Sequence, residues 1–136
     1  MKKILMDSGP LIALFDRSDK YHLASVDFIR NNNKELITTI ASITEALHLL
    51  SFSREAQIDF LAWIDAGALT IASIALDDFN RIKELTIKYA DLPMDFADAC
   101  LVLLGEKLNI SHIATIDRDF DVYRLKGKQP FTTYIK

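Results

Sequence analysis

Short apolar runs alternate with longer helical patterns along the sequence, and this alternation restricts the fold more than any other feature. The apolar runs predict strands at residues 3–6, 35–39, 68–73, 111–115 and 131–135. The helical patterns cover residues 10–16, 22–32, 40–51, 54–66 and 77–89 and the segment after Pro93, and residues 117–124 form an irregular or short helical connection. Short strands separated by helical segments are typical of βαβ units. The sequence therefore predicts an α/β fold with a five-stranded, mostly parallel sheet flanked by helices.

Composition is consistent with one ordinary domain. The chain has 136 residues, of which 50% are hydrophobic, with four glycines and three prolines, so it can bury a substantial core. The single cysteine, Cys100, lies in an apolar run, which favours a buried thiol in a reducing compartment. The first apolar stretch stops at Asp7, too early for a signal peptide, and no later one approaches the ~20 residues that cross a bilayer. We expect a soluble, cytoplasmic protein that does not bind membranes.

The charge distribution excludes one class of nucleic-acid binder. A net charge of −3 argues against a protein that holds nucleic acid by electrostatic attraction alone, although an enzyme can still contact it locally. The segment from Arg118 to Lys136 is basic while the chain as a whole is acidic. This basic segment is either a phosphate-binding surface or an ordinary solvated surface.

Four acidic residues fall near the ends of predicted strands. Asp7 directly follows the first strand, and Glu45 lies in the first turns of the helix after the second. Asp117 comes two residues after Thr115, where the fourth strand ends, and Asp98 begins the helix before that strand. In parallel sheets, functional groups gather at the carboxyl ends of the strands. We therefore expect the four acids to converge on one edge of the sheet.

Each acid also has a purely structural explanation. Asp7 could cap the helix near Pro10, and Asp117 could begin a turn. Residues 42–45 and 95–98 have the spacing of capping boxes. Taken together, however, like charges ~5 Å apart repel by about 3 kcal/mol per pair at an effective dielectric of ~20, so such a cluster requires a cation. Carboxylates suit hard divalent ions, which polarise phosphates and activate water.

Other chemistries have weaker support. The Glu45-x-x-His48 pattern of di-iron bundles occurs once, whereas such a site needs two copies. Cys100 has no histidine nearby in the sequence to activate it, and there is no glycine-rich phosphate loop. The DSGPL segment cannot be a haloacid-dehalogenase motif, because Gly9 stands where the second aspartate is needed.

Four segments in order resemble the PIN-domain ribonucleases, and most closely the VapC-like toxins of toxin–antitoxin pairs. They are DSGPLIALFD, ITEALHLL, MDFADACLV and ATIDRDF. The resemblance runs from Asp7 to the final strand and implies a single PIN-like nuclease domain over residues 1–136. It further implies a Mg²⁺- or Mn²⁺-dependent endoribonuclease that forms a homodimer and is inhibited by a small antitoxin protein.

The resemblance also assigns roles position by position. The four acids of the family correspond to Asp7, Glu45, Asp98 and Asp117, as metal ligands and catalytic residues. Ser8 and Thr115 match hydroxyl positions beside those acids, and together with Arg118 they are candidates for contacting the substrate phosphate; Arg124 and Lys126 are further candidates. Asp95 fits a helix cap better than a ligand, and the roles of Asp119 and Asp121 stay open.

The main hypothesis is metal-assisted hydrolysis of an RNA phosphodiester, in which an acid orients the attacking water. One alternative is a non-catalytic PIN-like module that binds RNA or a partner protein. Others keep the acidic site but change the substrate: an RNA-processing or DNA nuclease outside toxin–antitoxin systems, or a phosphatase.

Overall fold

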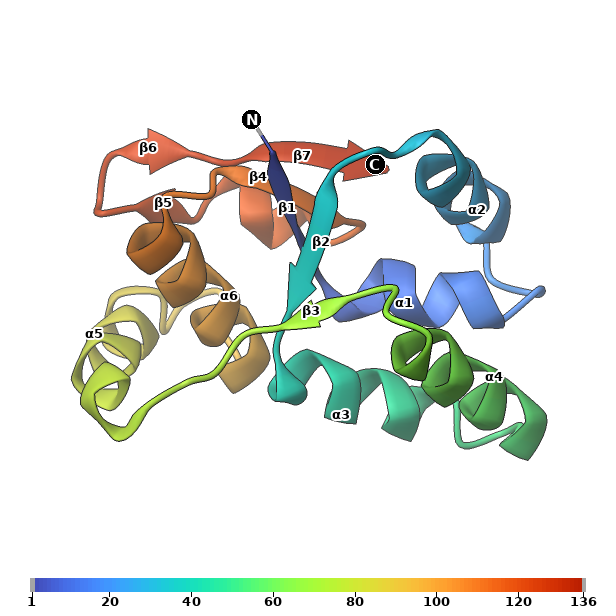
Figure 1. Cartoon of the computed structure of the whole chain (residues 1–136). Coiled ribbons are helices and arrows are strands. Elements are labelled where there is room, and N and C mark those ends of the chain that lie inside the picture. Colours follow the sequence, from blue (N-terminus) through green and yellow to red (C-terminus); the bar gives the residue numbers. More distant parts are fainter. Residues whose placement is uncertain (1, 136) are drawn as a thin grey trace.

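The computed structural model describes residues 2–135 and contains a five-stranded sheet in the order β3-β2-β1-β4-β7 (Figure 1). All four neighbouring strand pairs are parallel. The strands are β1 Lys3–Met6, β2 Glu35–Thr38, β3 Thr70–Ile71, β4 His112–Thr115 and β7 Thr132–Ile135. The predicted α/β fold with a parallel five-stranded sheet is confirmed.

The helices lie close to the predicted segments. They are α1 Ser8–Phe15, α2 His22–Asn31, α3 Ile40–Leu49, α4 Arg54–Asp65, α5 Phe79–Lys88 and α6 Phe96–Leu108, with short 3-10 turns η1 Leu76–Asp78 and η2 Arg118–Asp121. Gly67, with φ +92°, follows the end of α4 in a conformation that glycine adopts without strain. Asn109 ends α6 in the left-handed region.

Two details differ from the sequence prediction. The predicted strand at 68–73 is reduced to the two residues of β3, which are exposed at the edge of the sheet and pair only with β2. A separate antiparallel hairpin, β5 (Arg124–Leu125) and β6 (Gln129–Pro130), was not predicted. Strands of two residues are too short to produce an alternating pattern.

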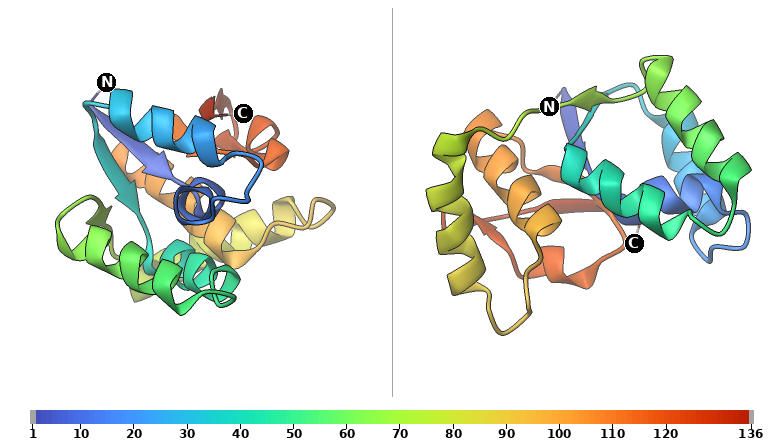
Figure 2. Two further views of the ribbon diagram at one scale, coloured as in Figure 1. Left: turned by 90° about the vertical axis from the view of Figure 1, so that its right-hand side faces the viewer. Right: turned by 90° about the horizontal axis from the view of Figure 1, so that it is seen from below.

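The side chains of β1 show how the sheet separates two cores. Successive residues of a strand point to opposite faces. Leu5 packs into a cluster with residues of α5 and α6, whereas Ile4 and Met6 pack with residues of α1, α3 and α4. Figures 1 and 2 accordingly show α5 and α6 on one side of the sheet and α1 to α4 on the other.

Helix α6 is the most buried helix of the first core. Every residue from Ala97 to Gly105 is buried, including Asp98, the one charged residue of that run. A helix that is apolar on all faces belongs in a protein interior. Even so, in the part of the chain that the structure describes, no helix is both long and apolar enough to span a membrane.

The strand order places one crossover point at the centre of the sheet. From β1 the chain builds β2 and β3 to one side, and later returns to build β4 and β7 on the other. In open parallel sheets, ligands bind beyond the carboxyl ends of the strands where the order reverses. Here that point lies between β1 and β4, which Asp7 and Asp117 directly follow.

Candidate metal centre

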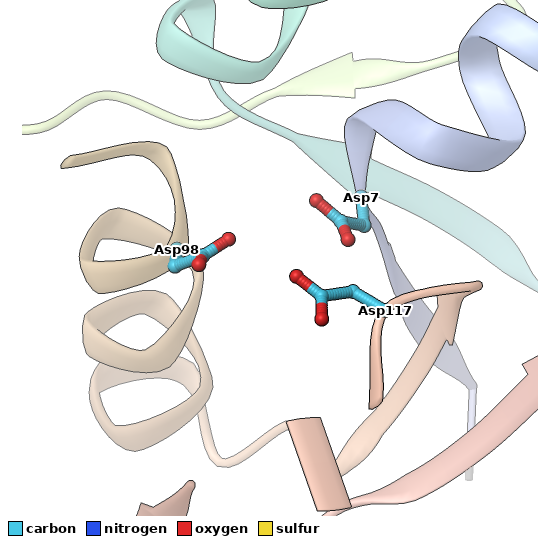
Figure 3. A group of neighbouring side chains, drawn as sticks. All are labelled: Asp7, Asp98 and Asp117. Atoms are coloured by element: carbon cyan, nitrogen blue, oxygen red, sulfur yellow. The ribbon is translucent and has the colours of Figure 1, made fainter. Parts of the chain in front are cut away.

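Three of the four predicted acids meet at this crossover point. One carboxylate oxygen each from Asp7, Asp98 and Asp117 lies within 4.8 Å of the other two. Asp7 comes from the junction of β1 and α1, Asp117 from the loop after β4, and Asp98 from the first turn of α6. In Figure 3 the three carboxylates point toward a common space.

Asp7 is held at both of its carboxylate oxygens. The backbone N–H of Ser8 donates to Oδ1 at 2.8 Å, so the side chain caps α1, which was the structural explanation considered for it. The Thr115 hydroxyl donates to Oδ2, also at 2.8 Å. Capping and a metal-binding role are therefore compatible for this residue, because each oxygen has further lone pairs to offer.

Gly9 allows α1 to approach the end of β4. A Cβ atom at this position would lie 2.6 Å from Cγ1 of Ile116, which is far too close. A larger residue would require Ile116 or the start of α1 to move, and Asp117 directly follows Ile116 while Asp7 precedes Gly9 by two residues. The glycine that excludes a haloacid-dehalogenase motif thus has a packing role in this fold.

Asp117 is linked to Asp7 through Thr115. The Thr115 hydroxyl oxygen accepts a hydrogen bond from the backbone N–H of Asp117 at 3.0 Å, and the same hydroxyl donates a hydrogen bond to Asp7. The Asp117 side chain caps η2 by accepting the N–H of Asp119 at 2.9 Å. One buried hydroxyl group therefore fixes the separation of two of the three acids.

Asp98 is 7% exposed and is positioned by two different neighbours. Its backbone N–H donates to the Asp95 carboxylate at 2.8 Å, and Asp95 is the N-cap of α6. Its own Oδ2 accepts a hydrogen bond of 3.0 Å from the hydroxyl of Tyr123. Sequence reasoning missed Tyr123, since no local pattern connects it to an acid 25 residues earlier.

Glu45 lies next to the three-acid cluster rather than within it. Its Oε1 accepts a hydrogen bond from the Ser8 hydroxyl, and its negative charge contributes to raising the pKa of Asp7. The capping-box explanation for residues 42–45 is wrong, because α3 begins at Ile40 and its cap is Thr39. Glu45 is therefore one turn inside the helix, with no capping role.

Burial and mutual repulsion disfavour the charged forms of the central acids. Burial, with smaller contributions from the charges of Asp117 and Glu45, raises the pKa of Asp7 to about 7, against the opposing hydrogen bonds from Thr115 and Ser8. Burial and the charges of Asp7 and Asp95 raise the pKa of Asp98 to about 8. Burial and the Asp98 charge also raise the pKa of Tyr123, so its hydroxyl stays a donor.

Within residues 2–135, no cationic side chain forms an ion pair with these acids. The ion pairs of this part of the chain join Arg81 to Glu84 and Glu106, and Lys107 to Asp78. A set of carboxylate oxygens with an uncompensated negative charge fits a hard divalent cation such as Mg²⁺ or Mn²⁺. The residues present therefore suit the metal that the resemblance implies.

The remaining candidates occupy different surroundings. The hydroxyls of Ser8 and Thr115 donate to acids of the site, whereas Arg118 is exposed in η2, next to Asp117. Asp119 is partly buried, and its burial and the charge of Asp117 raise its pKa. Asp121 is exposed at the end of η2.

The cap of α6 allows a prediction that separates structure from chemistry. Asp95→Ala removes the side chain that accepts the Asp98 N–H, whereas Asp95→Ser keeps a capping oxygen, and both variants remove the Asp95 charge that raises the pKa of Asp98. The free energy of unfolding should therefore be about 1 kcal/mol lower for the alanine variant than for the serine variant. Thermal unfolding of both variants in chelator measures this difference. Equal stabilities of the alanine and serine variants would contradict the capping role.

Comparisons with known proteins identify a matching domain family and a similar curated protein. Residues 4–126 match the PIN domain. The chain is 25% identical over 132 residues to Ribonuclease VapC26 of Mycobacterium tuberculosis (strain ATCC 25618 / H37Rv), an alignment that covers 95% of this chain and 98% of that protein.

Two solved structures are similar in fold. Mycobacterium tuberculosis VapC20, a toxin that cleaves the sarcin–ricin loop, has a TM-score of 0.80 at 17% identity, covering 88% of this chain and 93% of that one. A chain of Rickettsia felis VapBC2, solved with a DNA fragment from its promoter, has a TM-score of 0.65 at 9% identity, covering 97% and 98%. With its fold and the family match over residues 4–126, the chain belongs to the PIN domain family.

Proposed function

We propose that this chain is a divalent-metal-dependent endoribonuclease that hydrolyses RNA phosphodiesters and acts as the toxin of a toxin–antitoxin pair. The observation that carries the proposal is the cluster of Asp7, Asp98 and Asp117, whose oxygens lie within 4.8 Å of one another. Family membership and the similarity to a VapC ribonuclease over almost the whole chain support the same activity.

In this proposal the chain's own residues hold the metal and orient the reactants. Asp7, Asp98 and Asp117 are the ligands, and Glu45 completes the negative site and orients the attacking water. A bound Mg²⁺ or Mn²⁺ supplies Lewis acidity toward the phosphate and offsets the charge of the acids. Ser8 and Thr115 act mainly by holding Glu45 and Asp7 in place.

Arg118 is the proposed contact to the RNA backbone. It is exposed and adjacent in sequence to Asp117, so its guanidinium is available to a phosphate near the metal. Phosphate contacts position a strand without reading its bases. Arg118→Ala should therefore raise KM for RNA several-fold and affect all sequences alike, as measured by cleavage of two unrelated oligonucleotides.

Partner proteins form the second part of the proposal. Beside the cluster, a groove of about 910 Å³ runs between α3 and α6, with Ile40, Phe79 and Phe96 about half exposed or more. Exposed apolar surface of this kind is typical of protein contacts. This surface supports the two protein contacts that the resemblance implies, a homodimer interface and the binding of a small antitoxin, in a protein that we propose to be cytoplasmic. Sedimentation velocity of the purified chain tests the dimer.

The activity is tested by incubating the purified chain with single-stranded RNA, single-stranded DNA and a small phosphate ester. We expect RNA cleavage in Mn²⁺ or Mg²⁺, none in EDTA, and recovery when the metal is restored. Preference for DNA or the ester would favour the other metal-dependent hydrolases. RNA binding without cleavage in any metal would favour a non-catalytic module.

A further inference from the structure

Three of the four acids at the candidate centre accept a hydrogen bond from a hydroxyl group, and the fourth, Asp117, accepts a backbone N–H. Asp7 accepts from Thr115, Glu45 from Ser8, and Asp98 from Tyr123. A neutral donor fixes the plane of a carboxylate without cancelling its charge. An arginine or lysine in the same place would compete with a bound cation. Hydroxyl donors are therefore suited to acids that must remain available to a metal.

Asp98 depends on its hydroxyl donor more than the other two acids of the three-acid cluster do. Asp7 also accepts a backbone N–H, and Asp117 accepts one at η2. Among the residues that the structure describes, the Tyr123 hydroxyl is the one hydrogen-bond donor to the carboxylate of Asp98. Without it, rotation about the side-chain torsions of Asp98 would not be restrained by any donor.

Tyr123 is itself rigidly placed. Its ring is fully buried, and the rings of Tyr89 and Phe120 each contact it edge-on at a centroid distance of 5.0 Å. Close packing in a core restricts side-chain rotation, so the position of the hydroxyl is set by the aromatic cluster. The packing of Tyr123, which follows η2, therefore determines where its hydroxyl meets Asp98 on α6.

We propose that Tyr123 is the positioning residue that holds Asp98 in the orientation required for metal binding. The inference rests on the proposed metal-dependent function, and it adds to the four acids a fifth residue on which that function depends. Hydrogen bonds to ligating carboxylates fix their geometry, and losing such a partner typically weakens metal affinity by about 10–100-fold. Tyr123 does not contact substrate in this role.

The test compares two variants of one aromatic cluster. Tyr123→Phe removes the hydroxyl that donates to Asp98 and keeps the ring. Tyr89→Phe is the matched control, since its hydroxyl accepts the backbone N–H of Arg124 at 2.9 Å and contacts no acid of the site. Mn²⁺ affinity of the full chain is measured by calorimetry, with circular dichroism to verify folding and the Mn²⁺ dependence of RNA cleavage as a second readout.

We expect Tyr123→Phe to raise the Kd for Mn²⁺ about 10-fold, to shift half-maximal cleavage by the same factor, and to regain most activity at saturating Mn²⁺. Tyr89→Phe should leave the Kd within twofold of wild type. An unchanged Kd in Tyr123→Phe, or equal weakening in both variants, overturns the inference and leaves the proposed function standing. A wild-type chain that binds no Mn²⁺ and cleaves no RNA overturns both.

Discussion

Asp98→Asn is expected to abolish RNA cleavage while raising the stability of the metal-free protein. Asparagine has nearly the same shape, so α6 keeps its packing and the Tyr123 hydroxyl keeps an oxygen to which it can donate. What disappears is a negative charge that is 7% exposed and lies beside two other acids. We expect cleavage to fall by more than about 100-fold, because losing a ligand should cost more than losing a supporting residue.

The stability change has the opposite sign to that of most core mutations. In EDTA at pH 8, the wild-type protein has several buried acids whose negative charges repel one another without a cation. Asp98→Asn removes one of these acids and so reduces the repulsion. Its melting temperature should therefore rise. Asp59→Asn, on the exposed surface of α4, is a matched control that should change neither cleavage nor melting temperature. Retained cleavage, or a lower melting temperature for Asp98→Asn in EDTA, would contradict this account.

The placement of Asp7 and Asp117 at the same edge of the sheet could be predicted because it needs only the strand pattern. Both residues follow strands whose apolar runs are clear in the sequence, and parallel strands present their carboxyl ends at one edge. Predicting that Asp98 joins them required a further argument, because this residue reaches the site from a helix and not from the end of a strand. It was found as a charge in the first turn of an apolar segment, where burial needs compensation.

Other features depend on tertiary packing that no local pattern records. Whether Glu45 joins the acids or stands beside them depends on the distance between α3 and α1, which the Ser8 hydroxyl bridges. Tyr123 follows an irregular turn, so its orientation toward Asp98 had no periodic signal. The strand order that makes β1 and β4 neighbours is likewise a property of the whole sheet.

The stability of the metal-free protein should fall as pH rises from about 5 to 8. Asp7 and Asp98 have folded-state pKa values of about 7 and about 8, above the ordinary value of 3.8. The folded state therefore binds their protons more tightly than the unfolded state does. Their favourable contribution is complete below the unfolded pKa and is lost as the pH rises through the folded values. The sum of these losses is on the order of a few kcal/mol.

A divalent cation should reverse this trend, because it binds the deprotonated carboxylates and competes with protons. The increase in melting temperature on adding excess Mn²⁺ should thus be larger at pH 8 than at pH 5. Subtracting the Asp98→Asn curve removes the titration of histidines and of remote acids. In EDTA the wild type should fall progressively below the variant as pH rises, and in Mn²⁺ it should move above it. A difference that stays constant across this range in both conditions would mean that Asp98 neither carries a buried charge nor binds the metal.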